Sequence, residues 1–132
     1  MVELSLTLPV LVFGLLGGAD LARAFALQIA VENGSRAGAE AYAIDSTPTD
    51  AEAQATAVAE INRTPTANAT SLNVTVTKAQ TDGLTPCISP PTIATPCFVS
   101  IRVQYPWSTI TPWPLVPNSG MFDRTTTIRT FY

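Results

Sequence analysis

The sequence predicts an α+β protein in which one long N-terminal helix carries a small β-rich head, in the shape of a lollipop. Residues 1–44 are rich in apolar side chains and contain a single proline, whereas the chain from residue 72 onward alternates apolar and polar residues in short runs. The 132 residues suffice for one small core. We therefore divide the chain into a helical segment, 1–44, and an α+β head, 45–132.

The composition excludes several function classes. A formal net charge of −3, from 7 basic and 10 acidic residues, gives no electrostatic basis for binding nucleic acid. Histidine is absent and there are two cysteines, so zinc sites and histidine-dependent catalysis lack their usual side chains. We expect neither a cofactor nor a metal, and we expect that the protein is not an enzyme.

The first half of the helical segment has the composition of a membrane segment. Sixteen residues without a charge, Leu4 to Ala19, span about 24 Å as a helix, which is less than a hydrocarbon core of about 30 Å. Asp20, Arg23 and Gln28 are the polar residues in the apolar run that follows, which ends near Val31. Pro9 lacks a backbone donor, so we expect a kink or local melting there.

Small residues recur at every fourth position of this helix and predict a ridge for close helix packing. Glycine costs a helix about 1 kcal/mol relative to alanine, so glycines repeated in one row favour a packing role. A segment that is merely rich in alanine and glycine is the alternative. The ridge comprises Gly14, Gly18, Ala22, Ala26, Ala30, Gly34 and Gly38.

The second half of the helix is expected to meet water. Glu32, Arg36 and Glu40 are spaced four residues apart, as in mutually supportive ion pairs on an exposed helix face. This helix ends near Ile44, before a turn cluster. A short second helix then follows to about Asn62, with Thr47 as its N-cap.

Three strands are expected in the rest of the head, enough for an antiparallel sheet with one covered face. Period-2 alternation marks Leu72 to Thr77 and Val99 to Tyr105, and β-favouring residues fill 124–132. Residues 106–117 hold four prolines and predict a long loop. Its Trp107 and Trp113 either cap the sheet or form an exposed contact surface that could serve adhesion.

Cys87 and Cys97 flank a proline-rich loop, 87–97, that a disulfide would close. Closing a ring of this size stabilises the fold by roughly 3 kcal/mol. A disulfide places the head outside the cytoplasm. Two free thiols are the alternative, but no basic side chain lies nearby in the sequence to activate them.

Glu3 is the ionisable residue at the tip of the apolar helix, where a carboxylate is costly unless a cation meets it. The surrounding residues, 2–12, together with 17–25 and 31–43, resemble the N-terminus of TadE-like proteins, the pilins and pseudopilins of the Tad (type IVc) pilus. The resemblance covers about the first third of the chain.

The resemblance implies a structural subunit that is held in the inner membrane, loses a basic leader to a prepilin peptidase and passes through the pilus assembly platform. Its helix then packs with copies of itself or with other pilins in an extracellular filament at the cell surface. Glu3 corresponds to the family's glutamate, usually the fifth residue, that pairs with a neighbour's N-terminal amine. Such a pair would fix the register between subunits.

Other readings remain open from the sequence. One is a single-pass membrane-anchored envelope protein whose extracytoplasmic head never polymerises. Another is a secreted domain with a signal peptide ending near Ala24, although the first residues carry none of the Lys or Arg that such peptides begin with.

Overall fold

The computed structural model describes residues 2–88, 91–114 and 117–130, and the side chains of Val2, Glu3 and Ala69 lie outside that description. It confirms the α+β fold: a long helix α1 (Val2–Ile44), a short helix α2 (Asp50–Ile61) and a three-stranded antiparallel sheet. The strands are β1 (Asn73–Ala79), β2 (Cys97–Ser108) and β3 (Ser119–Thr130), in the order β1-β2-β3. A single 3₁₀ turn, Ala69–Ser71, precedes β1.

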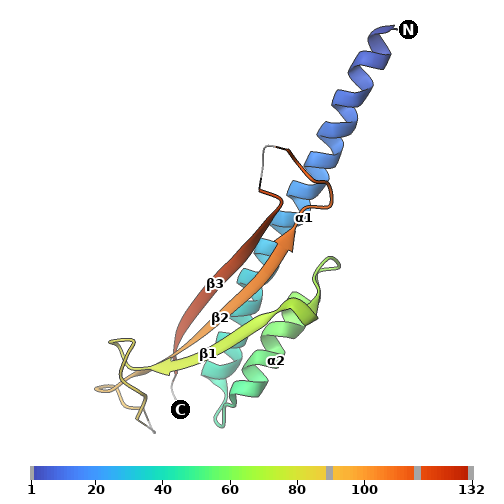
Figure 1. Cartoon of the computed structure of the whole chain (residues 1–132). Helices are drawn as coiled ribbons and strands as arrows, with labels where there is room; N and C mark the ends of the chain where they lie inside the picture. The colour runs from blue at the N-terminus through green and yellow to red at the C-terminus, as the bar shows by residue number, and fades with distance from the viewer. Residues whose placement is uncertain (1, 89–90, 115–116, 131–132) are drawn as a thin grey trace.

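The molecule has one layer of helices on one face of the sheet (Figure 1). The C-terminal half of α1 and all of α2 cover that face, while the N-terminal half of α1 extends beyond the sheet. Helix α1 is continuous through Pro9, so the local melting expected there does not occur.

The core forms where the period-2 pattern of β2 meets the apolar faces of the helices. Val99, Ile101 and Val103 are fully buried, and Leu27 and Val31 of α1 lie in the same cluster. The alternate residues of β2 face outward, because successive side chains of a strand point to opposite faces. The alternation predicted from the sequence is therefore confirmed.

Helix α2 begins two residues later than the sequence suggested. Its N-cap is Thr49, whose hydroxyl accepts from the Glu52 backbone N–H at 3.2 Å and donates to the Glu52 carboxylate at 2.6 Å. Thr47, the predicted cap, instead donates its N–H to Asp45 in the preceding turn. Two Thr-x-x-acid sequences overlap here, and the one with the longer glutamate side chain forms the cap.

Glycines of α1 permit the close approach of α2. A Cβ on Gly38 would lie 2.9 Å from the Ala53 carbonyl oxygen and 3.1 Å from the Ala57 Cβ. A Cβ on Gly34 would overlap Ile61, which is fully buried. The two helices therefore pack backbone against backbone at these positions.

The predicted loop over 106–117 is wrong at its start, because β2 continues through Pro106 and Trp107 to Ser108. The pairing of β1 with β2 ends at Gln104, so beyond that residue β2 has a neighbour on one side only, β3. Proline fits such an edge because no ladder bond is required of its nitrogen on the open side.

Strand β3 begins at Ser119, five residues before the predicted start. Its last described residue is Thr130, while residues 131 and 132 lie outside the description.

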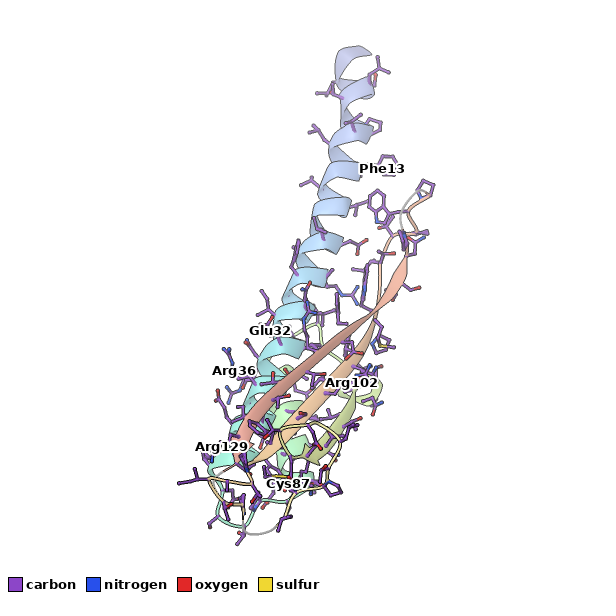
Figure 2. All side chains as sticks on the ribbon, turned by 90° about the vertical axis from the view of Figure 1, so that its left-hand side faces the viewer. Phe13, Glu32, Arg36, Cys87, Arg102 and Arg129 are labelled. Carbon is purple, nitrogen blue, oxygen red and sulfur yellow. A yellow bond between two sulfur atoms is a disulfide. The ribbon has the colours of Figure 1, made fainter. Side chains whose placement is uncertain are left out.

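The ion pairs predicted along α1 are not formed among the described residues. Glu32, Arg36 and Glu40 are exposed, as expected, but the ion pairs found among the described residues do not join them. Figure 2 shows Glu32 and Arg36 pointing away from the sheet.

Candidate functional site

The N-terminal half of α1 is an exposed apolar surface. Its most apolar 18-residue window has a mean hydropathy of 1.8 and only 6% of it is buried, so this half is not a core helix. By length and composition α1 could cross a membrane. The exposed large side chains of the segment are Leu4, Leu6, Leu8, Val10, Leu11, Val12, Phe13, Leu15, Leu16 and Leu21.

The row of small residues serves two different surfaces. A position four residues along a helix is rotated by about 40° beyond a full turn, so the row turns by about 240° between Gly14 and Gly38. Ala30, Gly34 and Gly38 are buried inside the molecule, the two glycines against α2. The other end of the row, Gly14, Gly18, Ala22 and Ala26, is exposed. Within the described part of the chain, a Cβ built on Gly14 or Gly18 meets no atom within 4 Å beyond its own stretch of helix.

Asp20 fixes the loop between β2 and β3 onto α1. One carboxylate oxygen accepts the Ile110 backbone N–H at 2.9 Å. The other accepts the Thr111 backbone N–H and the Trp113 indole N–H, both at 3.2 Å. Asp20 is 8% exposed, so its charge is buried but satisfied by three donors.

Arg23 reinforces this contact three residues further along α1. Its guanidinium donates to the Ser108 carbonyl oxygen at 3.0 Å, at the end of β2. From the sequence alone, Asp20 and Arg23 marked only the end of the charge-free segment, and their contacts with the loop were not predicted. A lone acid after sixteen uncharged residues was the available signal, but its partner lies 90 residues away.

The two tryptophans lie in different surroundings. Trp107 belongs to β2 and stacks on Phe122, with ring centroids 5.6 Å apart and planes 14° apart. It also lies over Gly120, where a Cβ would come within 2.6 Å of the indole nitrogen. Trp113 belongs to the loop and meets Phe13 edge to face, with centroids 6.4 Å apart. Trp113 therefore contacts the apolar half of α1 directly.

A shallow apolar groove of about 340 Å³ lies between α1 and this loop. Gly14, Gly17 and Gly18 form its helical side, and Trp107 and Trp113 form the other. The exposed end of the small-residue row thus opens directly into the groove. Its remaining lining residues are Phe13, Asp20, Leu21, Ala24 and Thr109.

The disulfide lies at the opposite end of the head from the Trp113 loop (Figure 2). Cys87 and Cys97 are joined with their Cα atoms 5.4 Å apart, and Cys97 is the first residue of β2. The bond closes residues 87–97, the second part of the segment between β1 and β2, some of which lies outside the described residues. Leu84 and Ile93 of this segment are exposed.

The outer face of the sheet carries a charged pair across β2 and β3. The Arg102 guanidinium donates to both carboxylate oxygens of Asp123, and the Gln104 amide donates to one of them. The hydrogen bonds from Arg102, followed by that from Gln104, hold the pKa of Asp123 below its ordinary value.

Glu3, the predicted partner of a neighbour's amine, lies within α1, but its side chain is outside the described part of the structure.

The N-terminal segment of the chain is similar to a known protein family. Residues 1–40 match the sequence model of the family described as TadE-like protein. Neither the curated proteins nor the solved structures show a significant match to the chain. The matched segment ends four residues before the end of α1 and contains the whole exposed apolar surface. Through this N-terminal segment, the chain is similar to TadE-like proteins, which supports a protein associated with the Tad pilus system.

Proposed function

We propose that this protein is a structural subunit of an extracellular pilus filament, assembled by packing of the N-terminal halves of α1 from many copies, and not an enzyme. Before assembly, the same segment holds the subunit in the inner membrane. Copies of this chain or other pilins are its partners in the filament. A prepilin peptidase and the assembly platform act on it beforehand.

The observation that carries the proposal is the exposure of the apolar half of α1. Leu4, Leu6, Val10 and Leu15 are each at least 70% exposed. A continuous apolar surface of this size requires a lipid or protein environment. The head completes its own core without this half, so the half is available for other partners.

The open end of the small-residue row supports packing with other helices. Side chains that add little volume let helix backbones approach closely, whereas lipid contact alone does not require them. A Cβ added at Gly14 or Gly18 would meet no other side chain within 4 Å among the described residues of the monomer. The pairing of Glu3 with a neighbour's amine, implied by the family resemblance, would add a register-fixing contact at the tip of the same segment.

The test is to shear filaments from cells that produce the protein, identify the subunits by mass spectrometry and determine the filament structure by cryo-electron microscopy. We expect this chain in the filament, with residues 4–19 in a central helical bundle and the head at the surface. Recovery of the chain only as a monomer in the membrane fraction would reject the proposal. It would favour the non-polymerising, membrane-anchored protein instead.

A further inference from the structure

The loop 109–114 lies beside the part of α1 that would be inside a bilayer. A Cβ on Gly17 would lie 3.4 Å from the Trp113 ring, and Phe13 meets the same ring. Both helix positions lie within the charge-free segment Leu4 to Ala19. Phe13 is seven residues before Asp20, or about 10 Å along the helix axis. Figure 2 shows Phe13 on the side of α1 that faces the loop.

The length of the apolar segment brings the loop close to the membrane. About 24 Å of uncharged helix is shorter than a hydrocarbon core of about 30 Å. A short segment is accommodated by a thinner bilayer and by flanking residues at the interface. The bilayer boundary therefore lies close to Asp20, and the Trp113 ring lies on its membrane side.

The backbone of the loop suits a poorly hydrated environment. Ile110 and Thr111 donate to Asp20, while Thr109 and Trp113 donate to Asn118 at 2.9 and 2.6 Å. The two remaining residues between 109 and 114 are prolines, which have no N–H. Every backbone N–H from 109 to 114 thus has a partner within the protein. Irregular backbone at a membrane requires this, because lipid cannot supply the hydrogen bonds.

The outward side chains of the loop are apolar. Ile110 is 73% exposed, and Pro112 and Pro114 are exposed beside it. Tryptophan is enriched at membrane interfaces, where an apolar ring is combined with a polar N–H. Here that N–H is held by Asp20, at the end of the uncharged segment.

From these observations we propose that loop 109–114 is a membrane-interface anchor. It lies at the boundary between headgroups and acyl chains of the bilayer that holds α1, with Trp113 and Ile110 in contact with lipid. The head is therefore seated on the membrane before assembly and has a fixed depth. This inference depends on the membrane-held stage of the proposed function.

The chain contains two tryptophans, so each can be observed alone. Trp107→Phe leaves Trp113, and Trp113→Phe leaves Trp107 as a matched control. Trp107 stacks on Phe122, and the adjacent Ser108 is bound to Arg23, which lies about 9 Å further from the membrane than Gly17. Both variants are reconstituted as the full chain in phosphatidylcholine vesicles, with acyl chains brominated near the headgroup or unbrominated.

Flotation of the vesicles first establishes that each variant is inserted. We expect bromine to remove most of the Trp113 emission in Trp107→Phe and little of the Trp107 emission in Trp113→Phe. Aqueous iodide should have the opposite preference. If Trp107→Phe misfolds, the unaltered chain still provides a test, since its emission should divide into a lipid-quenched and a lipid-protected fraction.

Three results would overturn the inference. Strong quenching of Trp113 by iodide would place the loop in water. Protection of Trp113 from both quenchers would indicate cover by protein, such as the apolar helix of a second copy in the groove. Failure of the chain to float would remove the membrane-held stage of the proposed function as well, whereas the first two results leave that stage intact.

Discussion

Gly38 lies where α1 closely approaches the backbone of α2. A Cβ there would meet the Ala53 carbonyl oxygen at 2.9 Å, and a backbone atom cannot move aside as the end of a side chain can. We predict that Gly38→Ala lowers the free energy of unfolding by about 1–3 kcal/mol, the usual cost of overpacking. Denaturant unfolding of the full chain in detergent micelles, followed by circular dichroism, measures the change.

Gly18→Ala is the matched control, because it is the same substitution in the same helix. A Cβ on Gly18 meets none of the described residues within 4 Å outside its own stretch of helix. Alanine should therefore leave stability unchanged or raise it by up to about 1 kcal/mol through its helix propensity. Equal losses in the two variants would contradict the division of the small-residue row into a buried and an open end.

We predict that Asp123 makes the free energy of unfolding of the head fall in acid. Its pKa is lowered in the folded state by hydrogen bonds from Arg102, so it binds a proton more readily when unfolded, where its pKa is about 3.9. The stabilisation is present above that value and is lost as the pH falls through the lower, folded pKa. Asp82, whose pKa is lowered by Thr85, contributes in the same direction.

Asp123→Asn should therefore flatten the dependence of the unfolding midpoint on pH between about 5 and 2. Glu40→Gln, at an exposed helix position outside the described ion pairs, is the comparison variant. Denaturant titrations of both variants and the parent at several pH values provide the measurement. A parent-like acid dependence in Asp123→Asn would show that this carboxylate is not coupled to folding.

Among the elements, those with a regular local pattern could be predicted from the sequence and those set by distant neighbours could not. The alternation from Val99 to Tyr105 predicted β2 because each apolar residue faces the helices. Its continuation through Pro106 depends on the pairing with β1, which stops at Asn73 opposite Gln104, and no local sequence pattern indicates where a distant strand stops pairing.

The candidate site shows the same division. The exposed apolar half of α1 was predictable, because hydropathy is a property of consecutive residues. The seating of the 109–114 loop on Asp20 was not, because it joins residues some 90 positions apart with no periodic signal. The small-residue row was recognised, but its rotation around the helix assigns its two ends to different partners.

The segment between β1 and β2 depends on its disulfide. The bond stabilises the fold mainly by reducing the conformational freedom of the unfolded chain. Replacing both cysteines should therefore lower the free energy of unfolding by up to about 3 kcal/mol. Cys87→Ala with Cys97→Ala should keep the pairing of β2 with β3, since Val99, Ile101 and Val103 still form the core.

Unfolding of the double variant beside the parent, with and without reductant, measures this effect. Reductant should destabilise the parent and leave the double variant unchanged. Loss of the sheet's circular dichroism in the double variant before any denaturant is added would show that the bond is required for folding.

At the scale of the whole molecule, the head and the apolar half of α1 are connected by one helix but depend on different surroundings. The head has its own core and the apolar half has none, so a change at the exposed end of the small-residue row can alter assembly without altering the monomer. Gly18 is the position that separates these effects most clearly, because it is open in the monomer and lines the groove.

We predict that Gly18→Leu abolishes or strongly reduces filaments, while Gly18→Ala assembles. A leucine that separates closely packed helices costs about 1–3 kcal/mol at each contact, or about fivefold to 150-fold in each assembly step. Filament yield after shearing, measured against the amount of subunit in the membrane, reports assembly. Ala19→Leu adds similar bulk one position along, about 100° around the helix, and should retain more filaments than Gly18→Leu. If Ala19→Leu and Gly18→Leu reduce filaments equally, added volume anywhere on α1 is harmful, and close packing at this row is not what assembles the subunits.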